Sequence, residues 1–333
     1  MLKRRVRGRI YRWLLPMAFP CILICGCYRQ THDRIAVIPR TTGRIVWESL
    51  HTGVEAAGYT DGIRIYWNAP TRQDDVGGQI ALIDRLVARG GLQGIVIAPD
   101  QSLALITPVR RAVAHGIPVV ILGSPLLTPP SGKLVYVLND EEEAGRIAAR
   151  RVAAILHGKG TVAILGINPD IAGILRRARS FEALLVQSYP DIHVIDKRVG
   201  SFNVPHEQQV AEETLKAAPH LDSILTLSAS TTEGVLSTIG SNPEYSGIKV
   251  VGFDPDPVEF NSPNLDSLVL ENMPGMGACA INIIRDLQAG KTVPSRIEME
   301  PMLVTRENVR SAQVRQWSST DFRPGPHRNW GRS

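Results

Sequence analysis

The stretch Leu92–Leu122, LQGIVIAPDQSLALITPVRRAVAHGIPVVIL, determines the fold class that we expect for this chain. Its segment Gly94–Ala98 is a short run rich in β-branched residues, which is typical of a strand buried on both faces. Over residues 103–115 the apolar positions recur every three or four residues, which predicts a helix with one apolar face. A second apolar strand, Pro118–Leu122, follows. Strand, helix and strand in this order form a right-handed parallel βαβ unit, so we expect a parallel sheet.

The same alternation runs through most of the chain and divides it into two similar halves. A chain of 333 residues is longer than one hydrophobic core usually holds. The sequence therefore predicts an α/β protein of two doubly wound, Rossmann-like parallel-sheet lobes. Parallel sheets bind ligands at the carboxyl ends of their strands, here Pro99-Asp100 and Gly123-Ser124, and the groove between two lobes is the natural place for a ligand.

The first 27 residues have the three parts of an export signal: a basic start, an apolar stretch over residues 13–25, and a small residue before Cys27. The apolar stretch is short for a membrane span. The segment Ile24–Cys27 (ICGC) resembles a bacterial lipobox, which implies a signal peptide over 1–26, lipid on the Cys27 thiol and a polar tether over 27–32. An uncleaved anchor helix is the alternative, and two prolines in the stretch disfavour it.

Charge and motifs exclude several classes of function. The formal charge is +5, but six basic residues precede residue 27 without an acid, so the remainder carries −1 and gives no electrostatic reason to expect a nucleic acid. No hydrolase elbow or zinc-binding histidine motif occurs. Cleavage would leave Cys27 and Cys279, too few for a metal cluster, and we expect Cys279 to be a buried structural thiol. The sequence therefore predicts neither a metal nor another cofactor.

The order of elements and four segments resemble the type I periplasmic solute-binding proteins, and most closely the ribose- and galactose-type sugar binders, which are related to the lac-repressor-type effector domains. The similarity covers residues 34–305. The segments are GIVIAPDQSLALITPVRRAVAHGIPVVILGS (94–124), LNDEEEAGRIAARRV (138–152), KVVGFDPDP (249–257) and the late helix after Leu270-Glu271.

The resemblance implies a three-strand hinge, because the family's chain crosses between its lobes three times. The crossings would fall near Leu138-Asn139, Glu271-Asn272 and Glu300. The N-terminal lobe would then comprise 33–138 plus 272–299, and the C-terminal lobe 139–271 plus 300–312. The segment 313–333 mixes Ser, Arg, Gly and Pro without a period, which predicts a flexible tail.

The resemblance also implies a set of ligand-binding residues. Trp47 matches an aromatic ring that stacks on the sugar in relatives, and Asp254 matches the acid that follows Gly-Phe. The full set is Arg44, Trp47, Asn139, Asp140, Arg177, Ser228, Asp254 and Glu271.

The chain departs from the family pattern at several of these positions. Arg44 stands where Asn is common, Gly123-Ser124 replaces a carboxylate that is often followed by Arg, and Glu271 stands where Gln or Asn is usual. A guanidinium pairs well with an anionic group. A sugar acid, a phosphorylated sugar or a polyol is therefore as consistent with the sequence as a neutral pentose.

Each of these residues also has a structural interpretation. Asp254 before Pro255 is typical of a turn, Trp47 could belong to the core, and Arg44 could be a solvated loop charge. Glu271 could make a hinge hydrogen bond instead of contacting a ligand.

The sequence as a whole predicts an exported, lipid-anchored binding protein that faces the periplasm or the cell exterior. It would capture a small polar solute by hinge closure and deliver it to the permease of an ABC importer. The alternative is a module that presents the occupied form to a sensor kinase or a chemoreceptor. An enzyme is disfavoured, because no nucleophile, base and oxyanion-binding groups come together in the sequence.

Overall fold

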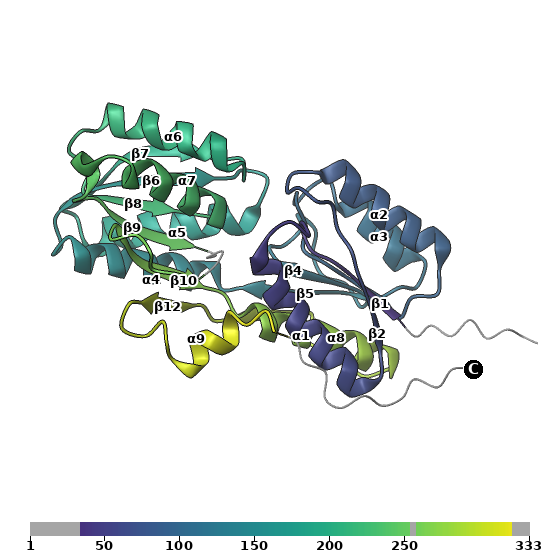
Figure 1. Cartoon of the computed structure of the whole chain (residues 1–333). Coiled ribbons are helices and arrows are strands. Elements are labelled where there is room, and N and C mark those ends of the chain that lie inside the picture. Colours follow the sequence, from purple (N-terminus) through teal and green to yellow (C-terminus); the bar gives the residue numbers. More distant parts are fainter. Residues whose placement is uncertain (1–33, 254–257, 322–333) are drawn as a thin grey trace, which may run out of the picture. The chain divides into compact units, whose positions relative to one another are not determined.

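The computed structural model describes residues 34–253 and 258–321. These residues form two six-stranded sheets, with strand orders β11-β5-β4-β3-β1-β2 and β12-β10-β9-β8-β6-β7. We call the first sheet and its helices the first lobe, and the second sheet and its helices the second lobe (Figure 1). Within each sheet the first five strands follow the same doubly wound order, with the switch point between β1 and β3 and between β6 and β8. The predicted fold class is confirmed.

The first lobe has a parallel sheet covered by helices on both faces. Its strands are β1 (Arg34–Ile38), β2 (Arg64–Trp67), β3 (Gly94–Ile97), β4 (Val119–Gly123), β5 (Leu134–Asn139) and β11 (Arg296–Met299). Its helices are α1 (Ile45–Asp61), α2 (Val76–Arg89), α3 (Ile106–Ala114) and α8 (Met273–Gln288). Helices α1 and α8 pack on one face and α2 and α3 on the other. Strand β3 is buried at every residue, which explains its continuous apolar run.

The second lobe repeats this arrangement. Its strands are β6 (Gly160–Ile167), β7 (Ile192–Val199), β8 (Ser223–Thr226), β9 (Lys249–Phe253), β10 (Leu265–Leu270) and β12 (Met302–Thr305). Its helices are α4 (Glu141–Ile155), α5 (Ala172–Ser188), α6 (Val204–Ala217), α7 (Ala229–Gly240), the short 3-10 helix η1 (Pro243–Tyr245) and α9 (Ala312–Trp317). Helices α4 and α5 cover one face, and α6 and α7 cover the other. Strand β12 runs antiparallel to β10, whereas the other pairings in this sheet are parallel.

The chain passes from one sheet to the other at three places among the described residues. It leaves the first sheet after β5, returns after β10, and leaves again between β11 and β12. Asn139, Glu271 and Glu300 stand in or beside these connections. Despite these crossings, each lobe has its own sheet and its own hydrophobic core clusters.

Three local features differ from the sequence expectations. Strand β11 was not predicted, because its residues alternate between exposed and half-buried and form no apolar run. Residues 312–317 form α9 where a flexible tail was expected; Ser311 caps it, and Val314 is buried against the second lobe. Cys279 is half-buried instead of buried, and partial burial raises the pKa of its thiol.

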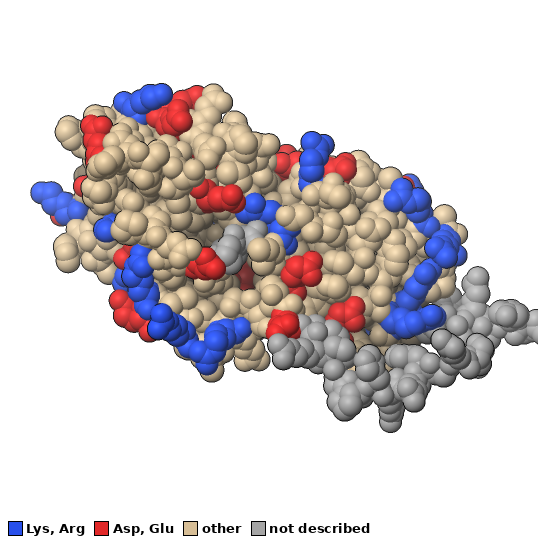
Figure 2. Space-filling model, viewed as in Figure 1, with Lys and Arg blue, Asp and Glu red and all other residues tan. Residues whose placement is uncertain are grey.

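Several expectations fall outside the described residues: the signal peptide over 1–26, the lipidated Cys27, the tether, Asp254 and the segment 322–333. Among the helices that the structure does describe, none is long and apolar enough to span a bilayer. Acidic and basic side chains both lie on the face seen in Figure 2, and uncharged residues make up most of that face.

Candidate functional site

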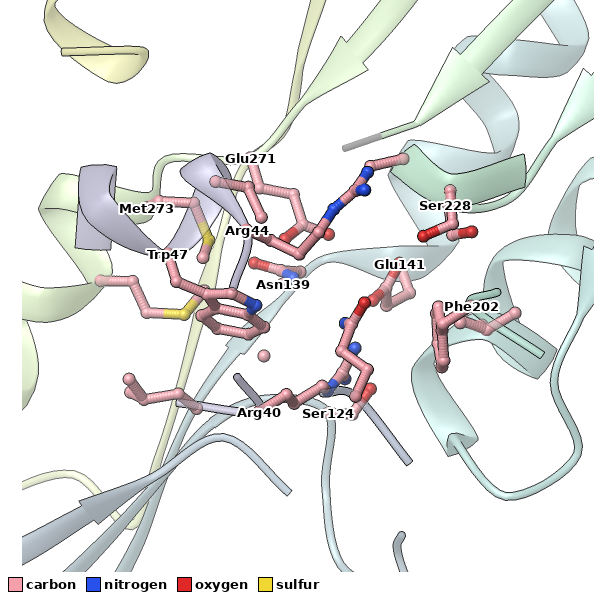
Figure 3. Close-up of a pocket in the computed structure, with 18 of the residues that line it drawn as sticks. Arg40, Arg44, Trp47, Ser124, Asn139, Glu141, Phe202, Ser228, Glu271 and Met273 are labelled. Atoms are coloured by element: carbon pink, nitrogen blue, oxygen red, sulfur yellow. The ribbon is translucent and has the colours of Figure 1, made fainter. Parts of the chain in front are cut away.

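A cavity lies where residues that follow the strands of both lobes come together. From the first lobe, Arg40 and Trp47 follow β1, and Ser124 follows β4. From the second lobe, Phe202 follows β7 and Ser228 follows β8. Figure 3 shows Trp47 and Met273 on one side of the cavity and Phe202 and Ser228 on the other. The carboxyl ends of parallel strands from both sheets therefore build one shared site, as expected for this type of strand arrangement.

Buried polar atoms of two first-lobe residues, Trp47 and Asn139, face this cavity without a hydrogen bond to the described residues. They are the indole Nε1 of Trp47 and the amide oxygen Oδ1 of Asn139, in side chains that are 7% and 5% exposed. Buried polar groups are almost always hydrogen-bonded in native proteins. The cavity therefore offers one donor and one acceptor that a polar ligand can satisfy.

Arg40 lies beside Trp47. Its guanidinium carbon is 5.8 Å from the centroid of the Trp47 ring, and its Nε donates to the carbonyl oxygen of Pro99 at 3.0 Å. A guanidinium near an aromatic ring is held by the quadrupole of the ring. Arg40 thus places a positive charge and an aromatic surface next to each other in the cavity.

Arg177, Glu141 and Glu271 of the cavity wall form a buried ionic network. Arg177 is 2% exposed and donates from Nε to Glu141 and from Nη2 to Glu271, both at 2.7 Å. Its Nη1 donates to the carbonyl oxygen of Leu227 at 3.2 Å, and its guanidinium carbon is 4.2 Å from the centroid of the Phe253 ring. A buried charge is tolerated only when it is paired and hydrogen-bonded, and this network meets both conditions. These contacts give Arg177 a structural role in addition to its place in the cavity wall.

An ion pair joins the two lobes close to the cavity. Nη1 of Arg44, at the start of α1, lies 3.2 Å from Oε2 of Glu233 on α7. The side chain of Arg44 is only 21% exposed, so it is not the solvated loop charge that was the alternative interpretation.

Six of the eight predicted ligand-binding residues line the cavity: Arg44, Trp47, Asn139, Arg177, Ser228 and Glu271. Asp140 does not. Its Oδ1 accepts a hydrogen bond from the backbone N–H of Glu143 and caps α4. The sequence explains this, because an acidic residue directly before a helical run is a preferred N-cap. Asp254 lies outside the described residues.

The sequence analysis missed several residues of the cavity wall. Arg40 stands in the loop after β1, where Arg44 and Trp47 were selected instead. Glu141 is the first residue of α4, and it is buried and pairs with Arg177. Phe202 follows β7 and has a left-handed backbone, φ 55°. No spacing pattern singles out any of the three, because each is positioned by the end of a strand.

Asp100 lies next to this region and is the most strongly perturbed acid of the first lobe. Asp100 is 3% exposed, and Gln79 Oε1 accepts a hydrogen bond from its backbone N–H. Burial raises the pKa of Asp100 to about 7, while the positive charge of Arg40 opposes the shift. A considerable fraction of this side chain is therefore neutral at pH 7.

The described residues contain no group of three or more His, Cys, Asp or Glu side chains that could hold a metal ion. The polar groups of the cavity are instead guanidinium, carboxylate, amide, hydroxyl and indole groups. Such a set, beside apolar and aromatic surface, suits a small ligand with several hydrogen-bonding groups.

Known proteins are similar to this chain in sequence and in fold. The chain is 26% identical to the ribose import binding protein of Bacillus subtilis over 264 residues, 78% of this chain and 83% of that protein. It is 24% identical to the D-allose-binding periplasmic protein of Escherichia coli over 270 residues, 78% of this chain and 86% of that protein. Among solved structures, an ABC transporter solute binding protein from Agrobacterium vitis bound with α-D-tagatopyranose matches with a TM-score of 0.79 at 22% identity, covering 85% of this chain and 98% of that one.

The family model of the periplasmic binding protein domain matches residues 35–292, which include β2 to β10, all of β1 except Arg34, and every residue that lines the cavity. By its sequence and its fold, this chain belongs to the periplasmic binding protein domain family.

Proposed function

We propose that this protein binds a sugar or sugar derivative in the cavity between its lobes and delivers it to an ABC importer outside the cytoplasm. The main support for this proposal is that both lobes contribute to one cavity. In this cavity Trp47 Nε1 and Asn139 Oδ1 are buried and make no hydrogen bond to the described residues. A ligand that contacts both lobes stabilises the closed form over the open form, because it makes all of its contacts only there.

The chemistry of the cavity supports a sugar-like ligand. Trp47, Phe202 and Met273 give apolar and aromatic surface, which suits the C–H face of a sugar ring. Asn139 and Ser228 can hydrogen-bond to hydroxyl groups. Relatives of similar length include binding proteins named for ribose and for D-allose, and a solved relative is bound with a tagatose ring.

The basic side chains of the cavity extend the range of ligands. Arg40 and Arg44 reach it from the first lobe, and the two acids Glu141 and Glu271 are both hydrogen-bonded to Arg177. A sugar acid or a phosphorylated sugar therefore belongs in the ligand screen beside neutral sugars and polyols.

A thermal-shift screen tests this proposal. The purified protein is heated with D-ribose, D-allose, D-arabinose, D-tagatose, a set of sugar acids and phosphates, and polyols, each at 1 mM. A ligand present at about 100 times its Kd stabilises the folded state by about 2.7 kcal/mol and raises Tm by several degrees. The bound compound should be recovered unchanged, as expected of a binding protein. A rise with amino acids or peptides and none with any sugar-like compound would contradict the proposal.

We also propose that Cys27 anchors the mature protein to a membrane through a lipid. The support is the lipobox-like segment Ile24–Cys27 after a basic and apolar start. In the native host, Cys27→Ala should move the protein from the membrane fraction to the soluble fraction or block its processing, and mass spectrometry of the wild-type N-terminus should find a diacylated cysteine. An unmodified wild-type N-terminus would contradict the anchor and leave the sugar-binding proposal intact.

A further inference from the structure

Helix α5 begins without a capping side chain from its own lobe. Its N-cap residue, Ile171, has an aliphatic side chain and makes no side-chain cap hydrogen bond. By contrast, Asp140 caps α4, Asn203 caps α6 and Ser228 caps α7, each through its own side chain. The first N–H groups of a helix have no partner within the helix and need one elsewhere.

Hydrogen-bond acceptors for the first N–H groups of α5 come from the first lobe. The hydroxyl of Ser102, after β3, accepts a hydrogen bond from the backbone N–H of Ala172 at 3.2 Å. The hydroxyl of Ser124, after β4, accepts one from the backbone N–H of Gly173, also at 3.2 Å. The backbone N–H of Ser102 in turn donates to the carbonyl oxygen of Asp170 at 2.9 Å.

These contacts are buried and closely fitted. Ser102 is 5% and Ser124 2% exposed. A Cβ atom at Gly173 would lie 2.2 Å from the Ser124 hydroxyl oxygen and 2.7 Å from Glu141 Oε1, so only glycine allows this approach. The two serines therefore do for α5 what an N-cap residue does for other helices, but from the opposite side of the cleft.

We propose that Ser102 and Ser124 are cross-cleft helix caps that hold the two lobes together in the absence of ligand. Opening the cleft breaks three hydrogen bonds and leaves the start of α5 without a side-chain cap. Closing it restores them without any contribution from a ligand. The ligand-free protein should therefore contain a substantial closed population.

Distance measurements between spin labels test this proposal on the full-length protein. Labels on Ala88→Cys in α2 and Ala217→Cys in α6 sit on exposed positions of the two lobes, and the four native cysteines, Cys21, Cys25, Cys27 and Cys279, are replaced by serine. Ligand-free wild type should show a population at the distance given by this structure. Replacing a serine N-cap by alanine costs about fivefold in the equilibrium constant. Ser102→Ala and Ser124→Ala should each shift the closed-to-open ratio by about fivefold, and the double variant by more than tenfold.

Ser311→Ala is the matched control, because the Ser311 hydroxyl caps α9 and makes no hydrogen bond to the first lobe among the described residues. It should leave the distance distribution unchanged. Circular dichroism checks that all variants fold. If the double variant does not fold, the two single variants still test the proposal. The proposal is overturned if ligand-free wild type shows only a longer distance, or if the serine variants give the same distribution as wild type. Because no ligand is present, the result does not depend on whether the cavity binds a sugar.

Discussion

Trp47 gives the cavity two different kinds of contact: the face of its ring and the N–H of its indole. The ring belongs to the core cluster of the first lobe and also lines the cavity, so the core interpretation of this residue is confirmed and the stacking on a ligand stays a prediction. The Nε1 atom is buried and has no partner among the described residues. A ligand acceptor at this position would remove the cost of burying an unpaired donor.

Trp47→Phe separates these two contacts, because phenylalanine keeps an aromatic face and lacks the N–H. Loss of one neutral hydrogen bond costs about 1 kcal/mol, so we expect Kd for the sugar found in the screen to rise about fivefold. Isothermal titration calorimetry measures the change, and Trp47→Leu, which also loses the ring, should bind more weakly still. Equal affinities of wild type and Trp47→Phe would show that the ligand does not use Nε1.

Because of Asp100, we expect the free energy of unfolding to fall as the pH rises, whereas most acids in proteins have the opposite effect. Burial raises its pKa from 3.8 to about 7 in the folded state, so the folded protein holds a proton that the unfolded chain releases. As the pH rises from about 4 to 7, the unfolded chain ionises more readily than the folded protein, and the free energy of unfolding therefore decreases.

Asp100→Asn removes this dependence, because asparagine stays neutral. Relative to wild type, we expect Asp100→Asn to become more stable by about 1–3 kcal/mol in the free energy of unfolding when the pH is raised from 5 to 8. Urea denaturation at both pH values gives the difference. If the two proteins differ by the same amount at pH 5 and pH 8, then Asp100 is already ionised in the folded state.

Helices α4 and α5 are joined at their starts by the Arg177 network. Glu141 opens α4, Arg177 lies in α5, and Glu271 follows β10 at the second crossing between the sheets. Gly145 of α4 allows the two helices to approach, since a Cβ there would lie 2.3 Å from the carbonyl oxygen of Arg177. The network therefore fixes the helices of one lobe relative to the chain that leads to the other.

Arg177→Met should be strongly destabilising, because it leaves two buried carboxylates without their cation. Removing one partner of a buried ion pair costs about 3–5 kcal/mol. Arg150→Met is the matched control in α4: Arg150 pairs with Glu143 at the surface, where such a pair contributes about 0–1 kcal/mol. Urea denaturation of both variants compares the two costs. Equal costs would mean that the Arg177 network is hydrated in solution.

The two lobes contact each other at the edge of the cavity through groups with different exposure. The serine caps of α5 are buried, whereas the Arg44–Glu233 pair is partly exposed, with Glu233 53% exposed. Salt screens exposed ion pairs and has little effect on buried neutral hydrogen bonds. The closed form therefore combines a salt-sensitive contact with salt-insensitive ones.

Glu233→Gln should weaken ligand binding by about two- to fivefold at low salt, because an exposed ion pair is worth up to about 1 kcal/mol in the closed form. The loss should shrink at 0.5 M NaCl. Glu212→Gln is the control, since Glu212 pairs with Lys216 within α6 of the second lobe. Titration calorimetry at two salt concentrations measures both variants. If Glu212→Gln weakens ligand binding as much as Glu233→Gln does, then the loss of affinity comes from the change in net charge and not from the Arg44–Glu233 pair.

The fold could be predicted because buried parallel strands leave a continuous apolar run, as in Gly94–Ile97, and the helices between them show their apolar face in the spacing. Strand β11 and helix α9 were missed because one is half-exposed and the other buries only Val314. The cavity was predicted in part. Strand ends locate it in the chain, but pairings such as that of Glu141 with Arg177 join residues 36 positions apart and leave no local pattern.

Asn139 has a further consequence, since it is the last residue of β5 and the chain leaves the first sheet directly after it. A solute that hydrogen-bonds to Asn139 acts at the pivot of any movement between the lobes. A small rotation there becomes a large displacement at distant surface helices. Under the function proposed above, a membrane permease would distinguish loaded from unloaded protein by touching only those outer helices, without direct contact with the solute.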